Sequence, residues 1–106
     1  MQHNILFDVI AAGSCHSDGT ANVARGLAFA TTGAGVYTAT LDTDMGAADC
    51  VAFATIRNTT NMAYSITHTS NAPTVLTINT WKTDTKVATN CDFDLMVARI
   101  ASGASR

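Results

Sequence analysis

The sequence predicts an all-β protein: an antiparallel β-sandwich, jelly-roll-like, with about seven or eight strands. Apolar and small polar residues alternate with a period of two in short segments, which gives each strand one face for a core. Thr and Asn supply most of the polarity, while Glu is absent and Lys occurs twice, a balance that favours strands over helices. No segment has the apolar stripe of a crossover helix, so the strands are expected to pair antiparallel.

The expected elements follow one another with turns between them. Residues 4–11 form an apolar segment, expected as a strand or an extended arm, and residues 13–20 have the composition of a loop. Residues 23–30 alternate and are expected as one strand. The remaining strands are expected over residues 36–42, 51–57, 62–69, 74–81 and 92–100.

Alternation also assigns side chains to faces. In residues 23–30 the apolar face carries Val23, Leu27 and Phe29, with Arg25 near the strand end. Tyr37 is expected to share a face with Ala39 and Leu41, and Phe93 with Leu95 and Val97. In residues 74–81, Leu76 and Ile78 are expected opposite Val75, Thr77, Asn79 and Trp81. In residues 51–57, Val51, Phe53 and Thr55 are expected opposite Ala52, Ala54 and Ile56.

A length of 106 residues predicts a single domain spanning residues 1–106. We expect an N-terminal arm and loop over 1–20, the sandwich over 23–100 and a loose tail over 101–106. Hydrophobic residues make up 47% of the chain, but many are Ala, and there are only one Trp, two Tyr and four Phe. Such a core is thin, so oligomerisation is expected to add burial.

The charge pattern excludes several partners. The net charge is −2 and no basic run occurs, so we expect no nucleic-acid binding. No apolar stretch approaches the roughly 20 residues of a membrane span, so we expect no membrane partner. Charged residues make up only 13% of the chain, which indicates a surface partly covered by neighbouring molecules.

No residue pattern predicts catalysis, a metal site or a cofactor. Cys15-His16 has no second ligand pair at zinc spacing, and Asp42-Thr43-Asp44 lacks the Gly and Glu that an EF-hand requires at its sixth and twelfth positions. Phosphate-binding Gly-rich loops and a nucleophile elbow are also missing from the sequence. We therefore expect a protein that is not an enzyme and binds no cofactor or metal. The odd number of cysteines, Cys15, Cys50 and Cys91, favours buried free thiols over disulfides.

Two aromatic residues have alternative interpretations. Trp81 and Tyr64 are expected either in the core or an interface, or with an exposed face that stacks on a sugar ring. The sequence leaves both alternatives open.

Two stretches carry a family resemblance. Gly35-Val36-Tyr37-Thr38-Ala39-Thr40-Leu41 and Asn90-Cys91-Asp92-Phe93-Asp94-Leu95-Met96-Val97, with a Thr-rich strand from Thr74 to Trp81 between them, resemble the small jelly-roll knobs of tailed-phage capsid-decoration, cement and fibre proteins. These knobs are similar in outline to C1q and tumour-necrosis-factor domains. The resemblance covers residues 23–100.

The resemblance implies a homotrimer located on the virion, made in the host cytoplasm, with the major capsid protein or another virion protein as partner. It implies that the closing strand lies near the trimer axis, through Phe93, Leu95 and Val97 or through the opposite face of that strand. The apolar N-terminal arm is the second expected contact with the capsid or a sister subunit. The candidate contact residues are Ile5, Leu6, Phe7, Val9, Ile10, Phe93, Leu95 and Val97. The resemblance leaves open a second function, a receptor- or glycan-binding knob of a phage fibre or tail. A third alternative, independent of the resemblance, is an unrelated β-sandwich binding module.

Overall fold

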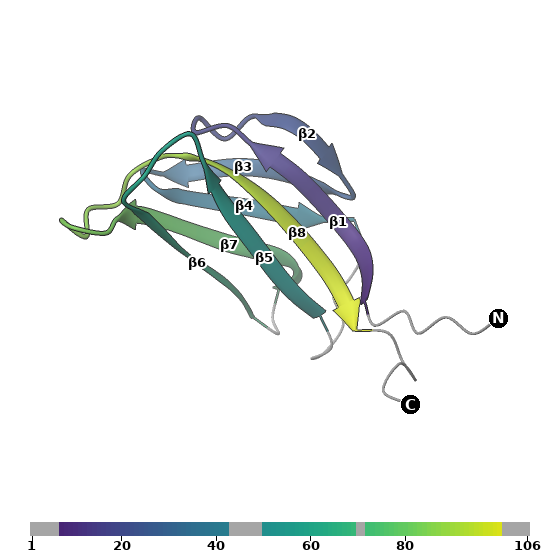
Figure 1. Ribbon diagram of the computed structural model, residues 1–106. Coiled ribbons are helices and arrows are strands. Elements are labelled where there is room, and N and C mark those ends of the chain that lie inside the picture. Colours follow the sequence, from purple (N-terminus) through teal and green to yellow (C-terminus); the bar gives the residue numbers. More distant parts are fainter. Residues whose placement is uncertain (1–6, 43–49, 70–71, 101–106) are drawn as a thin grey trace.

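In the computed structural model, which describes residues 7–42, 50–69 and 72–100, the chain folds into two packed antiparallel sheets of four strands (Figure 1). The predicted all-β sandwich is confirmed, and no helix occurs in the described ranges. Sheet A has the strand order β2-β1-β8-β5 and sheet B the order β3-β4-β7-β6. The strands are β1 (Phe7–Cys15), β2 (Ala21–Arg25), β3 (Leu27–Gly33), β4 (Val36–Leu41), β5 (Cys50–Arg57), β6 (Met62–Thr69), β7 (Ala72–Lys82) and β8 (Asp92–Ile100).

The strand order is jelly-roll-like. β1 and β8, the first and last strands, are neighbours in the middle of sheet A, and β4 and β7 are neighbours in the middle of sheet B. The chain changes sheet after β2, β4, β5 and β7, so successive strands wrap around one core. Figure 1 shows β1, β8 and β5 in front, crossing over the strands of sheet B behind them.

The core lies between the central strands, and the expected faces are confirmed there. The rings of Phe29 and Tyr37 both pack edge-on against Phe93, with centroids 5.7 and 5.0 Å from it. Such edge-to-face pairs add to the stabilisation that burial provides. The buried side chains around this cluster are Ala11, Cys15, Leu27, Ala39, Leu41, Leu76, Ile78, Leu95 and Val97.

Toward one side of the sandwich the core is incompletely covered. On edge strand β5, the inward side chains Ala52, Ala54 and Ile56 are only half-buried. On edge strand β6, Ile66 is half-buried and Tyr64 is 39% exposed. The sequence has few bulky residues, and the effect is local: between β5 and β6 the inward side chains are less buried than those at the centre of the sandwich.

One predicted strand is two strands. Residues 23–30 do not form a single element, because the chain turns at Gly26 with a φ of +74° and passes from sheet A to sheet B. A Cβ at Gly26 would lie 2.7 Å from the carbonyl oxygen of Ile10, so glycine is required here on both grounds. As a result Leu27 and Phe29 face the core as expected, whereas Val23 is 48% exposed on the outer side of sheet A.

Of the two expectations for the N-terminal segment, a strand or an extended arm, the structure shows the strand, which extends to Cys15 into the expected loop. Residues 7–15 form β1, which pairs with β8 on one side and β2 on the other, so they are a central part of the sandwich. β1 lies between β2 and β8, so it pairs with the side of β8 that would otherwise be an unpaired sheet edge. Residues 1–6 and 101–106 lie outside the described part of the chain.

Candidate interaction surfaces

The outer side of sheet A carries a group of exposed apolar side chains, which we call the sheet A face. The strand register places Met96 of β8 beside Phe53 of β5, and Ala98 of β8 between Val9 and Val51. Residues directly opposite in antiparallel strands share a face, so these side chains form adjoining rows. The members with the largest exposed fractions are Val9 at 58%, Phe53 at 50%, Val23 at 48% and Met96 at 37%.

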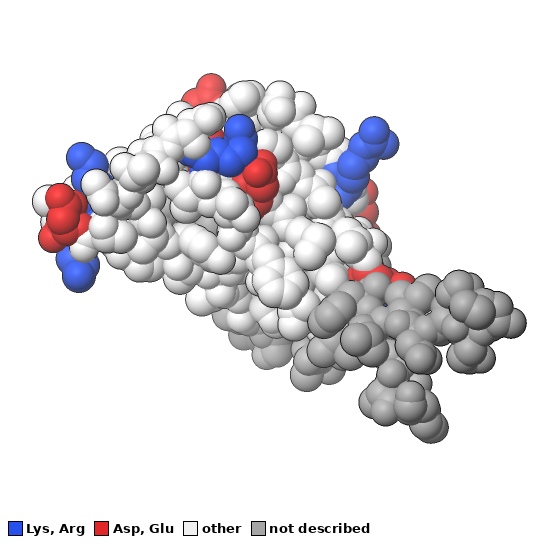
Figure 2. All heavy atoms as spheres, viewed as in Figure 1, with Lys and Arg blue, Asp and Glu red and all other residues white. Residues whose placement is uncertain are grey.

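Charge is sparse on this face. In the rows that cross it, Arg25 lies on edge strand β2, and Asp94 pairs with Arg57 through a 2.9 Å contact between Nε and Oδ1. The two charges of that pair largely offset each other for an approaching molecule. Figure 2 is viewed toward this face and shows it mostly white, with blue and red atoms in small separate groups. Contiguous apolar surface of this kind is typical of interaction sites.

Of the two sides of β8 that the resemblance offers as contacts, the structure places one between the sheets. Phe93, Leu95 and Val97 are buried between the sheets, with at most 3% of each exposed, so they are unavailable to a second subunit. The opposite side of the strand carries Asp94, Met96 and Ala98; Asp94 and Met96 are accessible there, whereas Ala98 is only 1% exposed. Phe93 in particular is the residue against which both core aromatic rings pack, which explains why its side must be internal.

The predicted contact residues near the N-terminus divide between two environments. Val9 is exposed on the sheet A face, whereas Ile10, the next residue, packs against the core. Ile5 and Leu6 lie outside the described residues, as does the side chain of Phe7.

Sequence reasoning did not single out Phe53, Val51 and Met96. Their signal was present, since the alternation of residues 51–57 put Val51 and Phe53 opposite Ala52 and Ala54. A strand whose larger apolar residues face away from its small ones indicates a second apolar surface. Which of the two faces is internal depends on the partner sheet, and this cannot be read from β5 alone.

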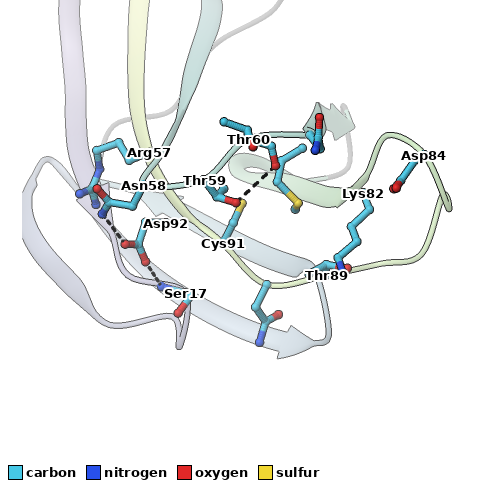
Figure 3. Close-up of a pocket in the computed structure, with 13 residues that line it drawn as sticks. Ser17, Arg57, Asn58, Thr59, Thr60, Lys82, Asp84, Thr89, Cys91 and Asp92 are labelled. Atoms are coloured by element: carbon cyan, nitrogen blue, oxygen red, sulfur yellow. Dashed lines mark hydrogen bonds between the residues drawn. The ribbon is translucent and has the colours of Figure 1, made fainter.

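A polar hollow of about 440 Å³ opens where three connections meet at one end of the sandwich (Figure 3). It lies among the β1–β2 loop, the β5–β6 turn and the β7–β8 loop. Two cations and two carboxylates occur in its lining, so their formal charges cancel. The lining residues are Ser17, Arg57, Asn58, Thr59, Thr60, Asn61, Met62, Lys82, Asp84, Thr89, Asn90, Cys91 and Asp92.

Asp92 joins the three connections around this hollow. Its Oδ1 accepts a 2.8 Å hydrogen bond from the backbone N–H of Ser17, and its Oδ2 accepts one of 2.8 Å from the side-chain amide of Asn58 (Figure 3). Asn58 adopts a φ of +62°, a conformation that Asn tolerates and that directs the β5–β6 turn. The two hydrogen bonds, that from Asn58 first, lower the pKa of the Asp92 carboxyl below its usual value.

Asp92→Asn is expected to destabilise the fold at pH 7 by about 1 kcal/mol, because a neutral amide accepts fewer and weaker hydrogen bonds from Ser17 and Asn58. A lowered pKa in the folded state means that the carboxylate stabilises the protein above its unfolded pKa of about 3.9, and that this stabilisation is lost as the pH falls through the folded pKa. Urea unfolding of both proteins at pH 7 and pH 3 measures this. A stability difference that is the same at both pH values would contradict the role of the ionised carboxylate.

Two cysteines are buried beside the same end of the core. Burial is the main cause that raises the pKa of the Cys15 thiol to about 11, and burial likewise raises the pKa of Cys91. Both are free thiols, the state that the odd cysteine count favoured. A thiol with such a pKa is protonated at neutral pH and is a poor nucleophile.

The hydroxyl of Tyr37 forms hydrogen bonds with the β1–β2 loop and the β7–β8 loop. Its hydroxyl donates a 2.8 Å hydrogen bond to the carbonyl oxygen of Ser17 and accepts one of 3.1 Å from the N–H of Cys91. Burial is the largest cause that raises the pKa of this phenol. These hydrogen bonds satisfy a backbone carbonyl in one loop and a backbone N–H in the other, so the role of Tyr37 is structural.

Within the described ranges, no three His, Cys, Asp or Glu side chains gather in a group that could hold a metal ion. Those same ranges contain no helix long and apolar enough to cross a membrane.

Comparison with known proteins returned nothing: no protein-family model, curated protein or solved structure matches this chain.

Proposed function

We propose that this chain is a virion structural protein, a homotrimeric decoration or cement protein that binds the outer shell of a phage capsid. The observation that carries the proposal is the sheet A face, where Phe53, Met96 and Val9 are 50%, 37% and 58% exposed in adjoining rows. Covering apolar area stabilises an assembly by about 25 cal/mol per Å². An otherwise solvent-facing sheet with bulky apolar residues and little charge therefore favours contact with another molecule.

Self-association is the first contact that this surface supports. The core is only half-covered along β5, whose outward residues Val51 and Phe53 belong to the sheet A face. Packing this side against a sister subunit would bury both the outward and the half-buried inward residues of the strand. Three copies around an axis accomplish this with a closed, repeated interface.

Attachment to a larger particle is the second contact. A shell repeats one site many times, so a trimer that touches several equivalent neighbours gains avidity from modest individual contacts. The abundance of Thr and Asn on the remaining surface suits such contacts, since these side chains form hydrogen bonds and lose little rotamer entropy when they are ordered.

Co-sedimentation tests this function. The purified protein is mixed with decoration-free phage capsids, and separately with host cells, and each mixture is sedimented. We expect the protein to pellet with capsids and to be lost from that pellet when Met96 is replaced by Asp, because a carboxylate on the sheet A face would be buried without a partner.

The matched control is Val87→Asp, which adds the same charge at a residue that is 58% exposed in the β7–β8 loop. Equal loss of capsid binding in both variants would point to a general charge effect and against the sheet A face. Pelleting with cells and not with capsids would instead support the receptor-binding knob.

A further inference from the structure

The outer side of sheet B differs from the sheet A face in its chemistry, and we call it the sheet B face. Its cross-strand rows join Thr38, Thr77 and Thr67 in one line and Val36, Asn79 and Ser65 in the next. None of the residues in these rows is charged. The face is therefore built from hydroxyl, amide and small apolar groups, carried by β4, β7 and β6.

The polar side chains on this face have unused hydrogen-bonding capacity. The side chains of Thr38, Thr77 and Asn79 are half-buried, yet none makes a hydrogen bond within the described part of the chain. A hydroxyl can donate one hydrogen bond and accept two, and a side-chain amide both donates and accepts. The face thus offers both kinds of group to a ligand.

Trp81 lies at one end of the same face. It follows Asn79 on the outward side of β7, opposite the buried pair Ile78 and Thr80, so it is not a core residue. Its cross-strand partners are both alanines, Ala63 on β6 and Ala88 in the β7–β8 loop. Trp81 is half-buried between these small neighbours, so part of its side chain remains accessible on the sheet B face.

A recess of about 480 Å³ adjoins the indole ring, within the range of about 300–1,000 Å³ that small-ligand sites occupy. Val36 and Ala88 give it apolar walls, while Asn79 and Lys86 bring polar groups to its border. The recess therefore combines an aromatic surface with a few groups able to orient a polar ligand. Its lining residues are Gly35, Val36, Asn79, Thr80, Trp81, Lys86 and Ala88.

We propose that the sheet B face is a binding site for a neutral glycan, with one pyranose ring stacked on Trp81 and the following sugars lying over Asn79, Thr77 and Thr38. A pyranose has an apolar C–H side that suits the electron-rich face of an indole. Its hydroxyls both donate and accept hydrogen bonds, as the side chains of this face do. Nucleic acids and acidic polysaccharides would require several cations, and among the residues that the structure describes only Lys86 contributes one to the lining of the recess.

This site goes beyond capsid decoration and uses the opposite side of the sandwich. Sheet A and sheet B form the two layers, so a molecule bound on the outer side of one layer leaves the outer side of the other free. A protein whose sheet A face is covered by sister subunits would still have Trp81 accessible on the sheet B face.

The single tryptophan makes the proposal directly measurable. Trp81 is the only Trp in the chain, so tryptophan emission, excited selectively over the two tyrosines, reports on this site alone. The full-length protein is titrated with neutral oligosaccharides, namely maltohexaose, cellohexaose, chitohexaose and mannohexaose, and with a heparin fragment as the charged probe. We expect a saturable change in Trp emission with at least one neutral oligosaccharide and none with heparin.

Substitutions then locate the ligand. Asn79→Ala and Thr77→Val retain Trp81, and each is expected to weaken binding about fivefold through the loss of a hydrogen bond. Thr55→Val, the same change on the outer side of sheet A, should leave the affinity unchanged. Trp81→Ala, followed by calorimetry, should abolish binding; if that variant does not fold, the Asn79 and Thr77 variants still decide.

Two results would overturn the proposal: a folded wild-type protein whose emission responds to none of the neutral probes, or equal affinities in the Thr77→Val and Thr55→Val variants. Met96→Asp, which tests the sheet A face, should bind the glycan like the wild type, so failure of capsid binding and failure of glycan binding are separate outcomes.

Discussion

Replacing Phe93 with Ala is expected to destabilise the fold by about 3–5 kcal/mol. Phe93 is fully buried, and the rings of Phe29 and Tyr37 both pack against it, so its removal leaves a cavity at the centre of the core. A domain of this size has a total stability of about 5–15 kcal/mol. The loss is therefore a large part of the whole, and denaturant unfolding followed by circular dichroism measures it.

Val87→Ala is the control for this substitution, because Val87 is 58% exposed and its removal leaves no cavity. Its free energy of unfolding should stay within about 0.5 kcal/mol of the wild-type value. If Phe93→Ala were as mild as Val87→Ala, β8 would have to present the other face to the core.

Gly35→Ala is the second substitution with a large expected effect, about 3 kcal/mol or more. Gly35 has a φ of +67°, and a Cβ there would overlap the carbonyl oxygen of Thr80 and lie 2.8 Å from the nitrogen of Thr89. The backbone cannot move aside easily, because the N–H of Gly35 donates to Asn90 Oδ1 at 2.7 Å and its carbonyl accepts from the N–H of Thr80 at 2.8 Å.

Gly33→Ala provides a matched comparison two residues away. A Cβ at Gly33 meets nothing within 4 Å, and its φ is not among the positive ones. We expect its stability to change by less than about 1 kcal/mol in either direction. Thermal unfolding of the two variants side by side distinguishes the effect of this turn from a general cost of adding a methyl group. Equal melting temperatures for the two variants would contradict the described turn.

Much of the fold could be predicted because its signals are local. The alternation in 36–42 and 92–100 puts large residues on one side of each strand, and Tyr37 and Phe93 are buried accordingly. The same periodicity set Trp81 opposite Leu76 and Ile78, and the structure agrees. A period of two reports which residues share a face, and it does so without knowledge of the rest of the chain.

The remaining features depend on contacts that are distant in sequence. Ser17 and Asp92 are 75 positions apart, and nothing near either of them indicates that they meet. The passage from one sheet to the other at Gly26 depends equally on the Ile10 carbonyl that approaches it. For the interaction surfaces, alternation identified two sides of β8 but not which one faces outward, since the packing of sheet B decides this.

Light scattering on the purified chain tests the central claim, that the sheet A face is completed by other copies of the protein. The account predicts a mass of about 33 kDa, three times the 11.0 kDa of one chain, and a fall to 11.0 kDa for Met96→Asp with its β-sheet circular dichroism retained. Val87→Asp should remain at the wild-type mass. A wild-type protein that stays at 11.0 kDa at millimolar concentration would contradict the claim.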